Sequence, residues 1–476
     1  MWTWVGATDP SFGGMLTWVD GDQEITPPLF TALSWVSVRL GDDRLLLALP
    51  SLLAGIATIG LVYALGRLLF DRRVALIAAA FAALSPGLAF FSVEARAYGL
   101  AIALVAASTL AMLLASEEGR SRWWWAGYAA LSAAAMYTHY TTAFVLVAQL
   151  GWLLWFRPAA RRPALIANVA AALAYVPWVP GLLADFDSPA KANHELLAPF
   201  GTDNLFSFAG TAAFGHPFAS LGRPSIGLNE FLGDWAEIAL FAGLAAAVAG
   251  VAVAWWRRRD EGARQPDDAA TAVRREHVIL IVALALAAPV GCVAVSLLTD
   301  DLYLPRNLIT SLPALLIACA ALVAAAPPAF RSIALVLTLG ALAYGAVSML
   351  RPEWSRPDVA AAAALIDREA EPGDAVLDAV WFAGQLPEGS VPPPLVLTLD
   401  AHLESVEADD ALSQADIEAG VEAAAGNRLW IVGPPPLVET AEAALGPDAG
   451  EPVVDEVYDG LIETQVVAIP IAAGER

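Results

Sequence analysis

The residues best suited to chemistry lie in a short polar segment between two long apolar runs. Glu94, Arg96 and Tyr98 place a carboxylate, a guanidinium and a phenol close together in the chain. Ionisable groups beside lipid are costly unless they are paired or used. A carboxylate there can act as a general base, and an arginine can clamp a phosphate through two parallel hydrogen bonds. These residues alone leave open a structural loop with a local Glu94–Arg96 ion pair.

Further candidate side chains lie in other polar segments that flank apolar runs. Their carboxylates could take a proton or hold a divalent cation such as Mg²⁺ or Mn²⁺, and their arginine could bind phosphate. No two histidines have the spacing of metal ligands, so the residues predict no firm metal site. Each segment also has a structural alternative, such as a solvated acidic loop, a hydrogen-bonded interfacial histidine or a snorkelling arginine. The candidates are Asp20, Asp22, Glu24, Tyr137, His139, Tyr140, Asp300, Asp301, Tyr303 and Arg306.

Composition predicts the elements that carry these residues. The chain of 476 residues is 58% hydrophobic with a mean hydropathy of +0.59, which is typical of an α-helical polytopic membrane protein. Cys292 and Cys319 fall inside apolar runs at different expected depths, so no disulfide is expected. We predict about ten transmembrane helices, at residues 45–66, 74–92, 98–115, 123–138, 141–156, 164–183, 235–256, 278–298, 307–326 and 331–350.

The distribution of arginine predicts which side of the membrane each loop faces. One set of alternate loops carries fifteen arginines, whereas the opposite set, up to residue 350, carries six basic residues. By the positive-inside rule, the first set is cytoplasmic. The external face then receives all the candidate residues, together with the loop 184–234 and the C-terminal tail. Since ten spans would also place residue 1 outside, we expect an additional first span that this sequence lacks.

The sequence divides into three predicted parts. Residues 1–44 form a first external loop, in which 27–40 is an amphipathic interfacial helix anchored by Trp35. Residues 45–350 form the transmembrane domain. Residues 351–476 are predicted to form a small extracytoplasmic α/β domain. Its expected strands lie near 375–380, 395–399, 429–432 and 464–469, and its expected helices at 357–369, 411–425 and 438–445.

The C-terminal part also carries most of the charge. It holds 25 acidic and 5 basic residues, whereas the whole chain has a net charge of −23. Such an acidic surface argues against binding to nucleic acid and against docking on anionic lipid. The part contains no glycine-rich phosphate loop and no nucleophile motif, so we expect it to stabilise the protein or to position an acceptor.

An ordered series of short motifs resembles the GT-C glycosyltransferases, most closely the bacterial and archaeal relatives of protein O-mannosyltransferases (family 39). The resemblance covers about residues 11–380. The motifs are 26–30 (TPPLF), 45–66, 67–70 (RLLF), 84–86 (LSP), 92–98 (SVEARAY), 137–140 (YTHY), 177–178 (PW), 305–307 (PRN), and Trp354 followed by Gly373-Asp374.

The resemblance implies a GT-C-like membrane enzyme. Such an enzyme moves a sugar from a polyprenyl-phosphate donor to a lipid, glycan or protein hydroxyl at the outer face of the plasma membrane, usually with inversion. The family's acidic motif after its first span is absent from this sequence, which leaves open a non-catalytic membrane scaffold of the same fold. A transporter or flippase is disfavoured, because the polar residues gather at one face and the sequence shows no repeat.

The resemblance also implies roles for individual side chains. One group supplies candidates for the catalytic base, a second binds the donor phosphate, and a third lines the substrate site. These groups are Glu94, Asp22 and Glu24 for the base, Arg96 and Arg306 for the phosphate, and Tyr98, His139, Tyr140 and Tyr303 for the substrate.

Overall fold

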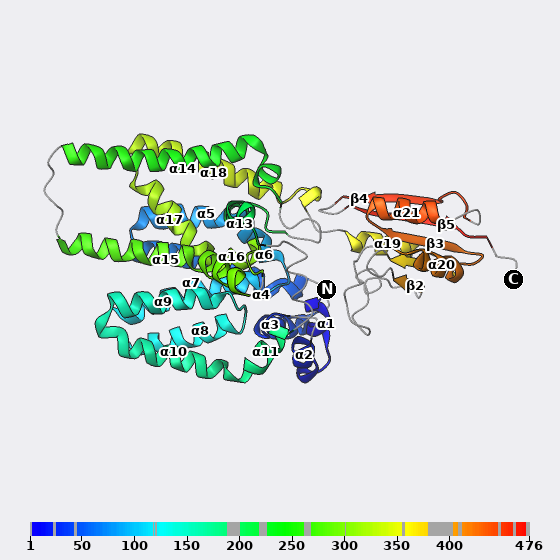
Figure 1. The fold of residues 1–476 in the computed structure, drawn as a ribbon, viewed down its shortest axis with the longest axis horizontal. Coiled ribbons are helices and arrows are strands. Elements are labelled where there is room, and N and C mark those ends of the chain that lie inside the picture. Colours follow the sequence, from blue (N-terminus) through cyan, green and yellow to red (C-terminus); the bar gives the residue numbers. More distant parts are fainter. Residues whose placement is uncertain are drawn as a thin grey trace. The chain divides into compact units, whose positions relative to one another are not determined.

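The computed structural model consists of two compact units, a helical unit Trp2–Ser348 and a second unit Met349–Arg476 (Figure 1). Each unit is described by itself. The structure describes residues 2–21, 25–41, 45–117, 119, 121–187, 200–218, 226–260, 268–299, 301–354, 358–378, 403–407, 412–445, 449–459 and 463–472.

The helical unit has the character of a membrane domain. Within the described ranges, seven helices are long and apolar enough to span a bilayer, and a bent pair would make an eighth. The seven are Leu45–Leu69, Tyr98–Ser116, Pro158–Asp185, Leu228–Arg257, Arg275–Leu298, Pro305–Ala325 and Pro328–Ser348. In order, they correspond to α4, α7, α10 (Arg161–Tyr175) with α11 (Val179–Asp187), α14 (Leu228–Asp260), α15 (Asp268–Leu298), α16 (Pro305–Leu308) with α17 (Leu312–Ala325), and α18.

The remaining predicted spans are helical as well. The run 74–92 forms the bent pair, α5 (Arg72–Ala83) and α6 (Pro86–Val93), whose axes differ by 55°. The runs 123–138 and 141–156 form α8 (Trp123–Met136) and α9 (Thr142–Phe156), of 14 and 15 residues. A straight span needs roughly 20 residues, so α8 and α9 are short for a bilayer.

The bend between α5 and α6 follows from the sequence Leu84-Ser85-Pro86. Ser85 is the N-cap of α6 and its Oγ accepts a hydrogen bond from the Leu88 backbone N–H at 3.3 Å. Pro86 then occupies the first turn, where a missing N–H costs nothing. A new helix therefore starts in a new direction and leads directly into the segment that contains Glu94.

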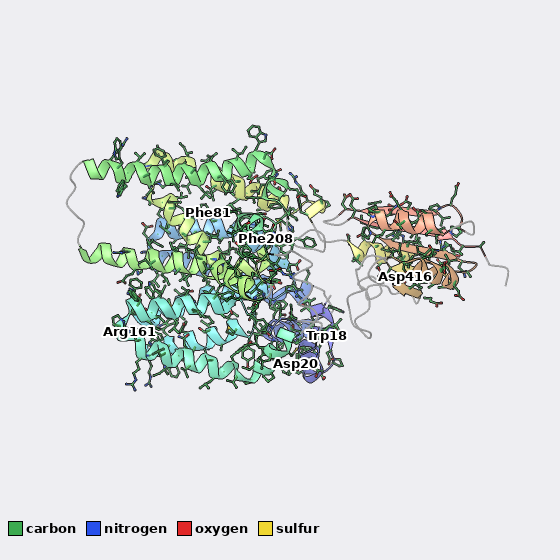
Figure 2. All side chains as sticks on the ribbon, in the orientation of Figure 1. Trp18, Asp20, Phe81, Arg161, Phe208 and Asp416 are labelled. Atoms are coloured by element: carbon green, nitrogen blue, oxygen red, sulfur yellow. The ribbon has the colours of Figure 1, made fainter. Side chains whose placement is uncertain are left out.

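Short helices gather at one end of the helical unit, where α1 (Trp2–Thr8), α2 (Phe12–Val19), α3 (Leu29–Ser37), α6 and α13 (Thr202–Phe214) lie (Figure 1). Trp35 of α3 helps to hold this group together, since its Nε1–H donates to the Asp9 carbonyl at 3.0 Å. The Arg39 guanidinium stacks 3.4 Å from the centre of the Trp35 ring. Trp18 and Asp20 lie at this end and Arg161 at the opposite end, as the arginine distribution predicts (Figure 2).

The second unit is a five-stranded sheet with helices on both faces. The strand order is β2-β1-β3-β5-β4, with β1 parallel to β2 and β3, and with β5 antiparallel to β3 and β4. One face packs on α19 (Val359–Glu369), and the other on α20 (Gln414–Ala423) and α21 (Pro435–Ala444). The strands are β1 (Ala375–Asp378), β2 (Glu404–Glu407), β3 (Arg428–Gly433), β4 (Val454–Tyr458) and β5 (Thr464–Pro470).

The sequence predictions for this unit are confirmed for β1, β3, β5 and the three helices. The strand expected at 395–399 lies outside the described residues. β2 and β4 were not predicted, because each is an edge strand whose charged residues break the apolar run, as at Asp455 and Glu456.

The first prediction concerns the close contact of α7 with the end of α6. A Cβ added at Gly99 would lie 2.5 Å from the Phe91 carbonyl oxygen, which belongs to backbone and cannot turn away. Gly99→Ala should therefore destabilise the protein by about 1–3 kcal/mol. Gly60→Ala is the control, since a Cβ there meets nothing within 4 Å. Thermal unfolding in nanodiscs measures the effect, and equal melting temperatures for the two variants would contradict this packing.

The second prediction concerns the buried carboxylate of Asp374. It accepts hydrogen bonds from Arg428 Nε at 3.0 Å, from Trp430 Nε1 at 2.9 Å and from the Glu371 backbone N–H at 3.0 Å. Burial opposes the charged form, but these bonds outweigh burial and hold the pKa of Asp374 below its ordinary value of 3.8. Because the folded-state pKa is lowered, the stabilisation is complete above the ordinary value and is lost as the pH falls through the lowered one.

Asp374→Asn should therefore destabilise this unit by about 3 kcal/mol at neutral pH, since it removes the buried carboxylate that pairs with Arg428. The difference from wild type should shrink in strong acid. Hydrogen exchange of the β3 amides between pH 2 and pH 7 measures both effects. A difference that does not depend on pH would show that the charge on Asp374 contributes nothing.

Candidate functional site

The segment with Glu94 is a tight loop between two helices. α6 ends at Val93, Glu94 is its C-cap with extended backbone, and α7 begins at Tyr98. The Glu94 backbone N–H still donates to the Phe90 carbonyl at 3.1 Å. Glu94 and Arg96 are partly buried, whereas Ala97 and Tyr98 are buried. The loop therefore holds a carboxylate and a guanidinium at a place that is only partly open to solvent.

Hydroxyl groups from two other helices fix the backbone of this loop. Thr3 Oγ1 of α1 donates to the Ala95 carbonyl at 2.8 Å, and Ser51 Oγ of α4 donates to the Arg96 carbonyl at 3.0 Å. Ser51 is completely buried. Two consecutive carbonyls of the loop are thus held by side chains from outside it, which fixes where the Arg96 side chain leaves the backbone.

An aromatic wall lines the loop on one side. The Tyr98 ring lies 5.1 Å from the ring of His139 and 4.8 Å from that of Phe91. His139 Nδ1 accepts the Thr141 backbone N–H at 3.3 Å and lies 2.9 Å from the Thr141 hydroxyl oxygen, which orients the ring. The structure therefore brings Tyr98 and His139 together.

A second buried histidine lies beside the same helix and was missed from the sequence. The His216 ring is 4.9 Å from Phe90 of α6 and 5.5 Å from Phe231, and the residue is completely buried. Its Nδ1 accepts the Phe218 backbone N–H at 3.3 Å, as in His139. His216 lies in the long loop 184–234, where no periodicity marked it. Its only signal was a histidine among aromatic residues.

Tyr140 belongs to a polar cluster at the end of α11. Its hydroxyl donates to the Asp185 carboxylate and accepts from Trp178 Nε1 at 3.2 Å. Burial raises the pKa of Tyr140, and the neighbouring Asp185 charge raises it further. Asp20 also lies close, since its Oδ1 is 3.0 Å from where a Gly181 Cβ would be. Asp185 was not predicted, although an acidic residue at the end of a span is itself a signal of function.

Tyr303 and Arg306 lie on a different side of the site. Tyr303 is buried, its hydroxyl donates to the Leu205 carbonyl at 2.9 Å, and its ring stacks on Phe208 of α13. Arg306 is partly buried on α16. α13 packs on both α16 and α6, so one helix contacts the elements that carry these two residues and the helix that precedes the Glu94 loop.

Three of the acidic candidates are Asp22, Glu24 and Asp300, and they lie outside the described residues. Across the ranges that are described, no group of three or more His, Cys, Asp or Glu side chains is arranged to hold a metal ion. The divalent cation considered from the sequence therefore stays a prediction.

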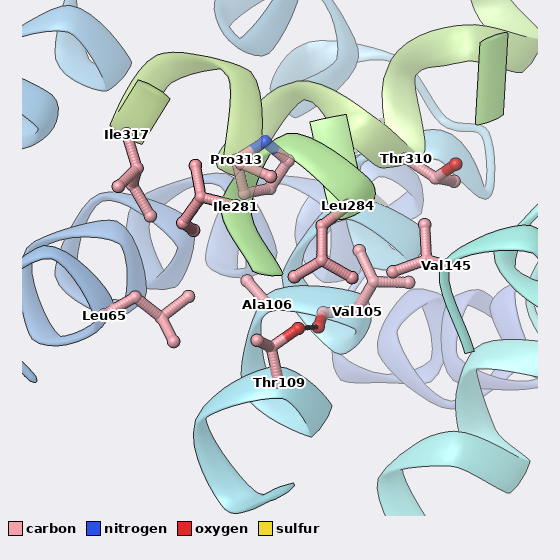
Figure 3. Close-up of a pocket in the computed structure, with 11 residues that line it drawn as sticks. Leu65, Val105, Ala106, Thr109, Val145, Ile281, Leu284, Thr310, Pro313 and Ile317 are labelled. Atoms are coloured by element: carbon pink, nitrogen blue, oxygen red, sulfur yellow. Dashed lines mark hydrogen bonds between the residues drawn. The ribbon is translucent and has the colours of Figure 1, made fainter. Parts of the chain in front are cut away.

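The described part of the helical unit contains a small apolar cavity that the Glu94 loop does not line. It is enclosed by α4, α7, α9, α15 and α17, with Thr310 at its rim (Figure 3). Its volume of about 10 Å³ corresponds to roughly one water molecule. Such a space cannot hold a sugar or a lipid phosphate, so we place the candidate site at the Glu94 loop.

A model of a known protein family matches the part of the chain that contains the Glu94 loop. Residues 26–180 match the family model described as dolichyl-phosphate-mannose-protein mannosyltransferase. This range contains Glu94, Arg96, Tyr98, His139 and Tyr140. No curated protein sequence matches the chain.

The chain is also similar to solved structures. The crystal structure of ArnT from Cupriavidus metallidurans bound to undecaprenyl phosphate matches with a TM-score of 0.52 at 16% identity, over 93% of this chain and 87% of that one. The same protein in the apo state gives 0.49 at 16% identity and the same coverage. The archaeal oligosaccharyltransferase AglB from Archaeoglobus fulgidus, in complex with an inhibitory peptide and a dolichol-phosphate, gives 0.42 at 15% identity, over 76% of this chain and 55% of that one.

The third prediction tests the Tyr140 cluster. Tyr140→Phe removes the donor to Asp185 and should destabilise the protein by about 1–3 kcal/mol, because a partly buried carboxylate loses a hydrogen bond. Tyr137→Phe is the matched control, since it removes an exposed hydroxyl that donates to the Ala174 carbonyl at 2.9 Å. Thermal unfolding measures both. If Tyr140→Phe destabilises the protein no more than Tyr137→Phe does, the hydrogen bond between Tyr140 and Asp185 contributes no special stability.

Proposed function

We propose that this chain, which belongs to the GT-C membrane glycosyltransferases by its fold and by its match over residues 26–180, transfers a sugar from a polyprenyl-phosphate donor. The acceptor is a hydroxyl of a lipid, a glycan or a protein at the outer face of the cell membrane. The observation that carries this proposal is the Glu94 loop, which holds a carboxylate and a guanidinium on a fixed backbone at one end of a membrane helical unit.

The donor side of the reaction is assigned to arginine. As the acceptor oxygen bonds to the anomeric carbon, the bond from that carbon to the phosphate oxygen breaks. The polyprenyl phosphate then leaves with an additional negative charge. Arg96 neutralises that charge through bidentate hydrogen bonds, and Arg306 helps from α16. The match to the structure of ArnT bound to undecaprenyl phosphate supports a donor of this class.

The acceptor side requires a base. The proton of the attacking hydroxyl passes to a carboxylate, for which Glu94 is the first candidate and Asp22 and Glu24 are the alternatives. Attack from the face opposite the phosphate inverts the anomeric centre. Tyr98, His139, Tyr140 and Tyr303 then line the substrate site.

The parts outside the membrane complete the proposal. The arginine distribution predicts that the loop 184–234 and the acidic C-terminal tail lie outside the cell. No role in nucleic-acid binding is expected, because that tail repels polyanions.

The fourth prediction is the loss of transfer on removal of the proposed phosphate ligand. The chain is reconstituted in liposomes with radiolabelled polyprenyl-phosphate mannose, glucose or arabinose, and with cell-envelope extract as acceptor. Arg96→Ala should lower the transfer rate at least about 100-fold, since a preorganised charge at the leaving group is lost. Arg161→Ala, at the opposite end of the unit, is the control and should leave the rate unchanged. Glu94→Gln should be as damaging as Arg96→Ala if Glu94 is the base.

The transferase proposal fails if none of the proteins consumes any of the three donors, provided that thermal unfolding shows wild type and variants to be folded. The non-catalytic scaffold of the same fold is then the better account.

A further inference from the structure

The first turns of α4 contain a proline with a structural consequence. Pro50 lies inside α4 and has no backbone N–H, so the Leu46 carbonyl four residues earlier lacks its helical donor. In a membrane protein such a carbonyl needs another partner, and serine hydroxyls of neighbouring helices commonly supply it.

Two serines of α3 meet this need. Ser37 Oγ donates to the Leu46 carbonyl at 2.6 Å, and Ser34 Oγ donates to the next carbonyl, that of Leu47, at 3.0 Å. Both serines are buried. α3 is thereby fixed to α4 at the position where the proline interrupts the hydrogen-bond ladder.

Exposed apolar side chains lie on α3 and on the 3₁₀ turn Val38–Leu40 that follows it. Leu33 and Val36 of α3 are 38% and 55% exposed, and Leu40 of the turn is 73% exposed. The sequence predicts that the segment 27–40 lies in the interfacial layer of the membrane. α3 thus carries exposed apolar side chains together with serines that are hydrogen-bonded to α4.

The same turn of α4 also holds the Glu94 loop. Ser51 follows Pro50 directly, and its hydroxyl donates to the Arg96 carbonyl. We propose that Ser34, Ser37 and Ser51 are positioning residues, which link the interfacial helix α3 through the proline-interrupted start of α4 to the backbone of Arg96. They do not touch the substrate in this account. The kinetic part of the inference rests on the proposed function, whereas the structural part does not.

The inference predicts a specific coupling between Ser37 and Pro50. Ser37→Ala leaves the Leu46 carbonyl without a donor and should loosen the loop, so that the amides of residues 95–98 exchange about tenfold faster. Pro50→Ala restores an N–H to that carbonyl. In the Pro50→Ala background, Ser37→Ala should therefore change the exchange rate little. Hydrogen exchange with mass spectrometry on the full chain in nanodiscs measures this cycle.

A control separates the link from the general loss of a buried hydroxyl. Ser108 is also completely buried, and its hydroxyl donates within α7 to the Val105 carbonyl at 3.0 Å. Ser108→Ala should leave exchange at residues 95–98 unchanged. If Ser37→Ala and Ser51→Ala also leave it unchanged, or if Ser37→Ala has the same effect with and without Pro50, the link is wrong.

Kinetics then show whether the link serves the reaction. Ser51→Ala should lower kcat about tenfold with a smaller effect on the KM for donor, because Arg96 acts on charge that develops as the phosphate leaves. Ser51→Thr keeps the hydroxyl and should restore most of the rate. If the exchange results hold while wild type transfers no sugar, the proposed function fails and the link stands. If transfer is normal in Ser51→Ala, the link does not position Arg96 for catalysis.

Discussion

The structure around the Glu94 loop depends on one constraint, which is that backbone carbonyls shielded from water need hydrogen-bond donors. The loop interrupts a helix pair, and Pro50 removes a donor from α4. Side-chain hydroxyls from α1, α3 and α4 meet these needs. A similar arrangement occurs beside Pro289 of α15, where Ser311 Oγ accepts the Ala288 N–H and donates to the Leu284 carbonyl. Small hydroxyl residues thus allow irregular backbone inside the helical unit.

The candidate site follows from that arrangement. A loop whose carbonyls are held by neighbouring helices presents Glu94 and Arg96 from a fixed backbone, so little reorganisation is needed when charge develops on a phosphate. The buried rings of Tyr98, His139 and His216 pack around α6 and its loop and exclude water from one side. Both histidines accept a backbone N–H at Nδ1, which orients their rings.

Hydropathy and arginine distribution predicted the membrane character and the end at which the candidate residues gather, because both reflect local composition. Residues 74–92 were predicted as one span, and the motif Leu84-Ser85-Pro86 contained the N-cap and proline that bend it. The roles of Ser51 and His216 depend on partners that lie far away in the sequence. Ser37 bonds to Leu46, nine residues on but in another helix, so its role depends on how the two helices pack. The edge strands β2 and β4 were missed for the related reason that their pairing, not their composition, makes them strands.

The central claim is that the Glu94 loop binds the phosphate of a polyprenyl donor. The most direct measurement is a cryo-electron microscopy structure of the full chain in nanodiscs with undecaprenyl phosphate. The account predicts phosphate density within hydrogen-bond distance of the Arg96 guanidinium, with the lipid tail running along the membrane-spanning helices. Well-ordered phosphate density at another place, with the Arg96 side chain resolved and making no contact with it, would contradict the account.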